Sequence, residues 1–438
     1  MSKSARQIAF EILLKIEKNK AYSNLAIDSA VKASCPDSTD CAFISRLVYG
    51  VTERKITLDY VISGYLSEPI SKLKKEVLVI LRLGTYQLLF SDKIPDSAAV
   101  NESVKLAKNN RCGFASGLVN AVLRNVAKHG FSVPEDLEPV KRISVLYSAP
   151  EELVKFLSYH YGENNAEEFL KTALEPKKVI IRVNTVKTSA ENLKKLLENE
   201  GVEVKTLSVA NALEINVNKA VYELQSYKDG LFHVEDISSQ LCIQALDPFE
   251  NCTLIDVCAA PGGKSFTAAE YMNNKGTVLS CDIYASRTDL IKDGAKRLGL
   301  NCIKTFVNDA TRFNGDFPEA DRVLCDVPCS GMGIIGKKPE IKYKNLDEIK
   351  ELLPVQKSIL ETASKYVKSG GRLVYSTCSV NPNENRKICD AFLKEHPEFH
   401  SVKVLPDTAR TVDEGDYLTL MLHTNNCDGF FIAVFDRK

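Results

Sequence analysis

The chain has 438 residues, of which 57 are Lys or Arg and 57 are Asp or Glu, so its formal net charge at neutral pH is zero. With 44% hydrophobic and 26% charged residues, the composition is that of a globular protein, and it excludes a disordered, collagen-like or coiled-coil chain. The zero is a cancellation, because residues 1–130 carry a net charge of +7, residues 131–235 of −4 and residues 236–438 of −3. A basic segment of this kind is typical of proteins that bind a polyanion.

The N-terminal part of the sequence is predicted to be helical up to about residue 128. Apolar side chains recur at helical spacing from Ile8 to Ile16 and from Leu58 to Tyr65. Further helices are predicted at Val77–Phe90, Ala98–Lys108 and Ala115–Ala127, the last one closed by His129-Gly130. We therefore expect an all-α domain over residues 1–130.

Two smaller segments are expected next. Pro134 and Pro139 mark a connection, and residues 150–174 are predicted to form one or two helices, so that residues 131–175 make a helical connector.

Residues 176–235 are predicted to be a small α+β subdomain. Its expected elements are a strand at Val179–Asn184, a helix at Ala190–Asn199 and short strands near Val202–Leu207 and Leu213–Val217.

From Asp236 onward the pattern alternates between strands and amphipathic helices. The predicted strands are Thr253–Val257, Thr277–Asp282, Ile303–Val307, Arg322–Asp326 and Arg372–Ser376, with a late hairpin of Tyr417–His423 and Phe430–Phe435. Such alternation predicts an α/β fold over residues 236–438, with a doubly wound, Rossmann-like parallel sheet that binds ligands at the carboxyl ends of its strands.

Neither the N-terminus nor the cysteines point to secretion or to a metal. No apolar signal region opens the sequence, and the best apolar run, Val77–Leu81, is far shorter than the ~20 residues of a membrane span. Thirteen cysteines form no disulfide framework, no Cys-x-x-Cys pair occurs and the six His are isolated. We expect a cytoplasmic protein without a metal site and without membrane association.

The first strand of the predicted sheet leads into the loop Asp256-Val-Cys-Ala-Ala-Pro-Gly-Gly-Lys-Ser265. Gly262 and Gly263 would let a ligand approach the backbone, and the following helix would offer its N–H groups to an anion. Asp282 ends the second strand, where a ribose diol is commonly bound, and Asp309 follows the third strand, within reach of an adenine edge. Together they predict an adenosine-type cofactor.

Two other interpretations of this loop remain open. The glycine pair is also compatible with a simple tight turn between strand and helix. Gly263-Lys264-Ser265 matches the end of a phosphate-binding P-loop, but Cys258 stands where that motif requires glycine and Pro261 removes a backbone donor. An ATPase is therefore the outside alternative.

Two later strands end in loops that carry a cysteine. The fourth runs into Asp326-Val-Pro-Cys-Ser-Gly-Met-Gly333 and the fifth into Tyr375-Ser-Thr-Cys-Ser-Val-Asn-Pro382. Cys329 and Cys378 would sit on loop tips among Pro, Ser and Gly, where reactive groups are often held. Beside the carboxylate of Asp326, they predict nucleophilic catalysis on an electrophilic carbon.

In this order and spacing, the motifs Cys-Ala-Ala-Pro-Gly-Gly-Lys, Asp-x-Pro-Cys-Ser-Gly and Thr-Cys-Ser resemble those of the RNA cytosine-5 methyltransferases, the Sun/Nop2/NSUN family. The resemblance extends from about Arg182 to the terminal Asp428-Gly-Phe-Phe, with Arg182-Val-Asn184 and Asp236-Ile-Ser-Ser-Gln240 as accessory motifs. The segment before residue 130 resembles the helical, RNA-binding NusB domain, notably from Ile94 to Lys108 and from Leu118 to Arg124.

The resemblance implies S-adenosylmethionine as cofactor. The residues that would bind it are Cys258, Ala259, Ala260, Pro261, Gly262, Gly263, Lys264, Asp282, Asp309 and Asp326. Carbon 5 of cytosine is a poor nucleophile, and addition of a thiolate to carbon 6 turns the ring into a nucleophilic enamine. The resemblance assigns that attack to Cys378, hydrogen bonds to ring N3 and N4 to Asp326, and removal of the carbon 5 proton to Cys329.

A NusB-like domain joined to this methyltransferase is the layout of the bacterial ribosomal RNA small-subunit methyltransferase B group, which implies 16S ribosomal RNA as substrate. The +7 domain would then bind phosphates, although a solvated helical surface is the alternative explanation of its charge. Other candidate phosphate contacts are Lys337, Lys338, Lys342 and Lys344. The alternative functions are 5-methylcytosine formation in tRNA or 23S ribosomal RNA, or a non-catalytic RNA-binding assembly factor. We expect a monomer.

Overall fold

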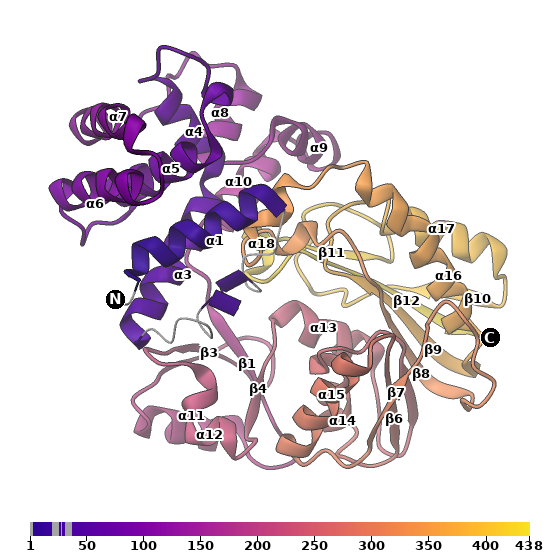
Figure 1. Ribbon diagram of the computed structural model, residues 1–438. Coiled ribbons are helices and arrows are strands. Elements are labelled where there is room, and N and C mark those ends of the chain that lie inside the picture. The colour runs from indigo at the N-terminus through magenta and orange to yellow at the C-terminus, as the bar shows by residue number, and fades with distance from the viewer. Residues whose placement is uncertain (1–2, 20–25, 28, 31–36) are drawn as a thin grey trace. The chain divides into compact units, whose positions relative to one another are not determined.

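The computed structural model describes residues 3–19, 26–27, 29–30 and 37–438 (Figure 1). The chain divides into two compact units, one made of Met1–Glu175 with Ile335–Lys344 and the other of Pro176–Ile334 with Asn345–Lys438. The parts of the predicted helical domain at 20–25, 28 and 31–36 lie outside the described residues. In the described part of the chain every helix is too short or too polar to cross a lipid bilayer, and no group of His, Cys, Asp or Glu there could hold a metal ion.

The first unit is helical, as the apolar spacing predicts. Its helices are α1 (Ala5–Asn19), α3 (Ser38–Glu53), α4 (Lys55–Ser63), α5 (Lys75–Phe90), α6 (Asp96–Asn109), α7 (Ser116–His129), α8 (Pro139–Tyr147), α9 (Glu151–Tyr161) and α10 (Glu163–Ala173). Helix α5 is buried from Val79 to Gln87, and it packs against α1, α4, α6 and α7. A helix that is buried on all sides forms the centre of such a bundle.

Helix α8 corrects the interpretation of Pro139 as part of a connection. Pro139 is the first helical residue, and the Glu138 side chain accepts a hydrogen bond from the backbone N–H of Lys141. Proline is favoured at this position because the N–H it lacks would have no partner inside the helix. The proline therefore begins a helix here.

The segment Ile335–Lys344 is part of the helical unit although it lies far along the chain. Lys342 Nζ donates to the carbonyl of Glu53 at 2.7 Å, and Tyr343 Oη donates to the carbonyl of Thr52 at 2.9 Å. Lys342 is only 4% exposed. The prediction of Lys342 as a phosphate contact is therefore wrong, because its ammonium group is buried against the end of α3.

The second unit begins with the predicted small α+β subdomain. Its antiparallel sheet has the order β2-β3-β1-β4. The elements are β1 (Val179–Val183), α11 (Ala190–Asn199), β2 (Glu203–Thr206), β3 (Ala212–Asn216), α12 (Gln225–Lys228) and β4 (Phe232–Val234). Leu193 and Leu197 of α11 pack on Ile181 and Phe232 in a core of its own. Strand β4 was not predicted, because three residues are too few to show a period.

The rest of this unit is built on an eight-stranded sheet with the order β10-β12-β9-β8-β5-β6-β7, in which β11 pairs with β12. The strands are β5 (Thr253–Asp256), β6 (Thr277–Asp282), β7 (Ile303–Val307), β8 (Ala320–Asp326), β9 (Val367–Thr377), β10 (Phe399–Val402), β11 (Leu418–Leu420) and β12 (Phe430–Arg437). Strands β5 to β9 pair in parallel, whereas β12 is antiparallel to β9. The predicted parallel sheet is confirmed.

Helices cover both faces of this sheet, as a doubly wound fold requires. They are α13 (Ile237–Leu246), α14 (Gly263–Tyr271), α15 (Ala285–Leu298), α16 (Leu352–Ser364) and α17 (Arg386–Glu395). Successive strand residues belong to different cores: Leu254 packs with α13, α14 and α15, whereas Ile255 packs with α16 and α17. Alternation of this kind follows from the two-residue period of a strand.

The late hairpin is present but shorter than predicted. Leu418 pairs with Ile432, as expected for antiparallel strands, yet β11 ends at Leu420. The following residues form the helical turn α18 (Leu422–Asn425), which Asn426 closes in the left-handed conformation with φ 51°. The predicted strand to His423 is therefore wrong in its second half, because a left-handed Asn favours the end of a helical turn.

Candidate active site at the carboxyl edge of the sheet

The loop after β5 requires glycine at its turn. Gly262 has a φ of 113°, and a Cβ there would lie 2.5 Å from the ring of Phe266. Helix α14 begins at the next residue, so its first backbone N–H groups have no partner within the helix. The turn thus presents a helix N-terminus at the edge of the sheet, which suits an anionic group of a ligand.

Asp256, the last residue of β5, is hydrogen-bonded to the helix that follows this loop. Ser265 Oγ donates to Asp256 Oδ2 at 2.7 Å, and Ser280 Oγ donates to Ser265 Oγ at 2.8 Å, so one chain of hydrogen bonds joins β5, α14 and β6. Burial raises the pKa of Asp256 to about 7. The sequence offered Ser265 only as part of the P-loop match and did not single out Ser280, since these contacts exist only when the three elements pack together.

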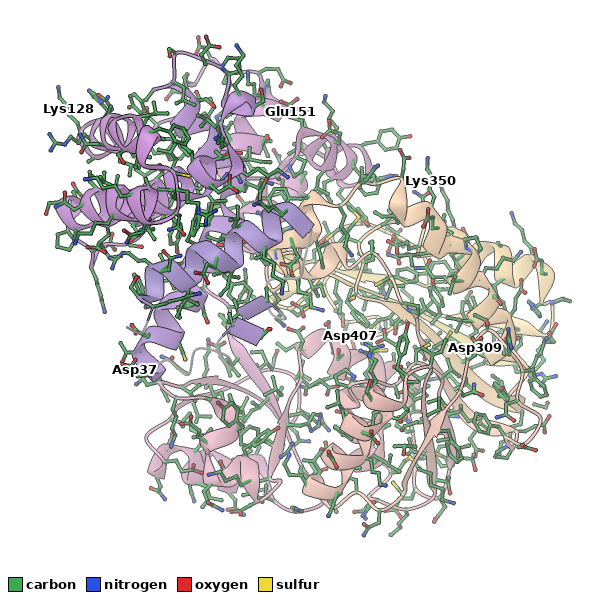
Figure 2. The ribbon with its side chains drawn as sticks, in the orientation of Figure 1. Asp37, Lys128, Glu151, Asp309, Lys350 and Asp407 are labelled. Carbon is green, nitrogen blue, oxygen red and sulfur yellow. The ribbon has the colours of Figure 1, made fainter. Side chains whose placement is uncertain are left out.

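Asp282 and Asp309 follow the neighbouring strands β6 and β7. Asp282 is 5% exposed; it accepts the backbone N–H of Tyr284 at 3.1 Å and lies 3.2 Å from Arg287 Nη1. Asp309, labelled in Figure 2, accepts from the N–H and hydroxyl of Thr311, and these bonds lower the pKa of Asp309.

Exposed apolar side chains adjoin these two carboxylates. Ile283 directly follows Asp282, and Val307 ends the strand that precedes Asp309; both are more than half exposed. Carboxylates for hydroxyl and amino groups beside apolar surface for a ring are the donor set that an adenosine needs. The residues present therefore fit the predicted cofactor.

Asp326 stands on the opposite side of β5, at the end of β8, and is held from two directions. Lys264 Nζ lies 2.9 Å from Asp326 Oδ2, and Ser376 Oγ donates to Asp326 Oδ1 at 2.8 Å. Burial alone would lower the pKa of Lys264, but the acidic groups around it, Asp326 first among them, together outweigh burial, so the pKa is raised and the lysine is charged. This lysine therefore orients a carboxylate, whereas the P-loop alternative requires it to reach a phosphate.

Cys329 and Cys378 come together although 49 residues separate them in sequence. Their Sγ atoms are 3.2 Å apart, and the backbone N–H of Gly333 donates to the carbonyl of Cys378 at 3.0 Å. The pKa of Cys329 is raised well above its usual range, first by its hydrogen bond with Cys378 and then by burial. Cys329 therefore keeps its proton at neutral pH and can donate it to the sulfur of Cys378.

The terminal and accessory motifs support this loop. A Cβ on Gly333 would lie 1.8 Å from the carbonyl oxygen of Gly429, and the Gly429 N–H donates to the carbonyl of Gly333 at 2.9 Å. The backbone N–H of Asp428, the residue before Gly429, donates to Asp236 Oδ1. The Asp236 side chain also accepts the backbone N–H of Ser238 and so caps the start of α13. The Asp236 motif and the Asp428-Gly429 motif thus meet at the loop that carries Cys329 and Gly333.

Comparison with protein families matches three segments of the chain. The family described as 16S rRNA methyltransferase RsmB/F matches residues 243–436, and the NusB family matches residues 3–128. A ferredoxin-like domain of RsmF/B-like methyltransferases matches residues 149–222.

Two curated bacterial proteins are similar over nearly their whole length. The protein described as probable ribosomal RNA small subunit methyltransferase B of Bacillus subtilis is 39% identical, with 99% of each chain covered. The protein of the same description from Synechocystis is 34% identical, with 98% of each chain covered.

Solved structures agree in fold. The crystal structure of PH0851 has a TM-score of 0.82 at 27% identity and covers 100% of both chains. NSun6 from Pyrococcus horikoshii, solved with SFG, has a TM-score of 0.60 at 21% identity and covers 67% of this chain and 99% of its own.

Proposed function

This chain belongs to the ribosomal RNA small subunit methyltransferase B family, and from that membership we propose that it methylates carbon 5 of a cytosine in 16S ribosomal RNA, with S-adenosylmethionine as methyl donor. The observation that carries the proposal is the contact of Cys329 and Cys378 at 3.2 Å beside the carboxylate of Asp326. Bound S-adenosylmethionine supplies an electrophilic methyl group. The chain's own residues must make carbon 5 nucleophilic and later release the product.

Cys378 is the proposed nucleophile, and Asp326 the group that holds the base. The thiolate of Cys378 adds to carbon 6, which makes carbon 5 an enamine carbon. Asp326, oriented by Lys264 and Ser376, accepts a hydrogen bond from the exocyclic N4 amino group, and it accepts a second one from ring N3 once N3 has taken up a proton from solvent during the attack. The target base has to leave its stack to reach these groups, which costs least in a loop or a weakly paired helix.

Cys329 is the proposed base for the carbon 5 proton. Its hydrogen bond with Cys378 is the first cause of its raised pKa, and that bond is lost once Cys378 is bonded to carbon 6. In the proposed step Cys329 gives its own proton to solvent and, as a thiolate, takes the proton from carbon 5. Elimination of Cys378 restores the aromatic ring and frees the product.

The decisive experiment uses purified full-length protein, deproteinised small-subunit ribosomal RNA and methyl-labelled S-adenosylmethionine. After digestion to nucleosides, we expect the label in 5-methylcytidine. A matched reaction with 23S ribosomal RNA or tRNA tests the substrate, and we expect little label there. Label in another nucleoside, or none in any RNA, contradicts the proposal.

A further inference from the structure

One buried carboxylate, that of Glu384, is hydrogen-bonded to both cysteine loops and takes no part in the reaction steps proposed above. Glu384 lies in the turn that precedes α17 and is 0% exposed. Its Oε1 accepts from the backbone N–H of Ser330 at 2.7 Å and from Gln356 Nε2 at 3.0 Å. Its Oε2 accepts from Ser330 Oγ at 2.6 Å and from Ser379 Oγ at 2.7 Å.

These donors come from both loops that carry the thiols. Ser330 directly follows Cys329, and Ser379 directly follows Cys378. The two hydroxyls also lie 3.0 Å from each other. Gln356 extends the same connection, because its Nε2 donates to the carbonyl of Pro328, just before Cys329, as well as to Glu384.

The carboxylate is itself held in place. Tyr375 Oη, which is fully buried, donates to the backbone carbonyl of Glu384 at 2.6 Å. Asn385, the next residue, accepts from Thr377 Oγ1 and donates to the carbonyl of Ser379. Burying a carboxylate is costly unless its oxygens are fully hydrogen-bonded, and here four neutral donors satisfy them. A rigid carboxylate of this kind can fix the relative position of two separate loops.

We infer that Glu384 is a positioning residue that joins the loops after β8 and β9 and so keeps the sulfurs of Cys329 and Cys378 in contact. The inference rests on the proposed function, since both thiol steps depend on that contact. Glu384 also adds to the causes that raise the pKa of Cys329, so the same carboxylate supports the state in which Cys329 holds its proton.

The test is Glu384→Gln in the full-length protein. The neutral amide weakens all four hydrogen bonds. Its NH2 group faces either the N–H donors of Ser330 and Gln356, or two serine hydroxyls that must give up their own donation to accept from it, so the two loops are held less tightly and the sulfurs move apart. Misplacement of reacting groups by ~1 Å can cost on the order of 100-fold in rate. We expect the single-turnover rate constants for formation and for release of the covalent RNA adduct each to fall about 10- to 100-fold, with unchanged affinity for S-adenosylmethionine and RNA.

The matched control is Glu395→Gln, at the far end of α17, where the carboxylate is half exposed and pairs with Lys357. It removes the same charge at the opposite end of α17 from Glu384 and should leave both rate constants unchanged. Loss of folded protein would lower the amplitude of a single turnover but not its rate constant, so the readout separates positioning from stability.

Two smaller substitutions keep the inference testable even if Glu384→Gln does not fold. Ser330→Ala should slow mainly adduct release, because it frees the Cys329 loop. Ser379→Ala should slow mainly adduct formation, because it frees the Cys378 loop. When either serine substitution is combined with Glu384→Gln, the rate constants should fall little further than in Glu384→Gln alone, because the three side chains belong to one hydrogen-bond network.

Rate constants for Glu384→Gln or for both serine variants within about twofold of wild type would overturn the inference, as would an equal loss in Glu395→Gln. These outcomes differ from failure of the proposed function. In that case the unsubstituted protein itself would form no 5-methylcytidine.

Discussion

The thiols of Cys329 and Cys378 are in contact, yet the proposed chemistry gives them different steps. Changing Cys378 to Ala should abolish both methylation and the covalent RNA adduct, because no other sulfur would attack carbon 6. Changing Cys329 to Ala should leave attack and methyl transfer possible but block loss of the carbon 5 proton, so a protease-sensitive, RNA-linked species should accumulate. Denaturing gel electrophoresis of labelled RNA checks both variants. The reverse pattern would mean that the two roles are exchanged.

Asp256 predicts a pH dependence of stability. Its pKa is raised by burial from 3.8 to about 7, so the folded state binds its proton more tightly than the unfolded state. The resulting stabilisation is complete below about pH 4 and is lost as the pH rises to 7. Asp256→Asn removes this titration and keeps an acceptor for Ser265. Relative to wild type, the variant should gain roughly 2–3 kcal/mol of stability between pH 5 and pH 8.

Thermal unfolding at both pH values measures that difference. The control is Asp407→Asn at an exposed carboxylate (Figure 2), whose stability relative to wild type should be the same at pH 5 and pH 8. If the free energies of unfolding of Asp256→Asn and wild type differed by the same amount at pH 5 and at pH 8, the prediction would be contradicted.

At the scale of the element, helix α5 has a charged group in its buried centre. Arg82 is 4% exposed and binds both oxygens of Asp59, at 2.6 and 2.7 Å, and Glu17 at 2.9 Å. The arrangement joins α5 to α4 and α1. Burial by itself would raise the pKa of Glu17, but the positive charges of Arg82 and Lys55 outweigh burial and hold that pKa below its usual value.

Changing Arg82 to Ala should therefore destabilise the helical unit, because the two carboxylates would face each other without their cation. We expect a loss of about 2–4 kcal/mol, less than for a wholly buried pair since both carboxylates are partly exposed. Hydrogen exchange of the α5 amides in the full-length protein measures it. Arg124→Ala, at an exposed position on α7, is the control, and equal exchange in the two variants would refute the prediction.

At the scale of the whole molecule, the zero net charge hides a division between a basic helical part and a mildly acidic remainder. Lys108 on α6 and Arg124 and Lys128 on α7 are exposed, and Lys128 lies at the outer edge of its helix (Figure 2). If these residues contact phosphates, changing all three to Gln should weaken RNA binding. The salt dependence of binding should also flatten, by a slope of ~0.7–0.9 per lost contact.

The matched control removes three exposed lysines from the small α+β subdomain, Lys195, Lys205 and Lys219. We expect this variant to keep the RNA affinity and the salt slope of the unsubstituted protein, measured by fluorescence anisotropy over a series of salt concentrations. Equal losses in the two triple variants would mean that general charge, and not the helical unit, governs binding.

Much of the fold could be predicted because its signals are local. Helix α11 is predicted to the residue, and each strand from β5 to β9 is found at its predicted place in the chain, although β8 and β9 begin earlier than predicted, at Ala320 and Val367. Strand β4 and the turn at α18 escaped prediction because they are too short to show a period. The interpretation of Pro139 as part of a connection is wrong because proline can either break a helix or begin one, and only the neighbouring residues decide which.

The sequence by itself determined the glycine turn after β5, the two cysteine motifs and the order of strand and helix, because each is a contiguous run of residues whose pattern does not depend on distant residues. Only the tertiary structure decided what lies beside each motif. In the folded chain Cys329 contacts Cys378, and Lys264 pairs with Asp326. Glu384 is hydrogen-bonded to the residue that follows Cys329, and Lys342 is buried. Those contacts join residues far apart in the chain, and their positions depend on packing that no local pattern records.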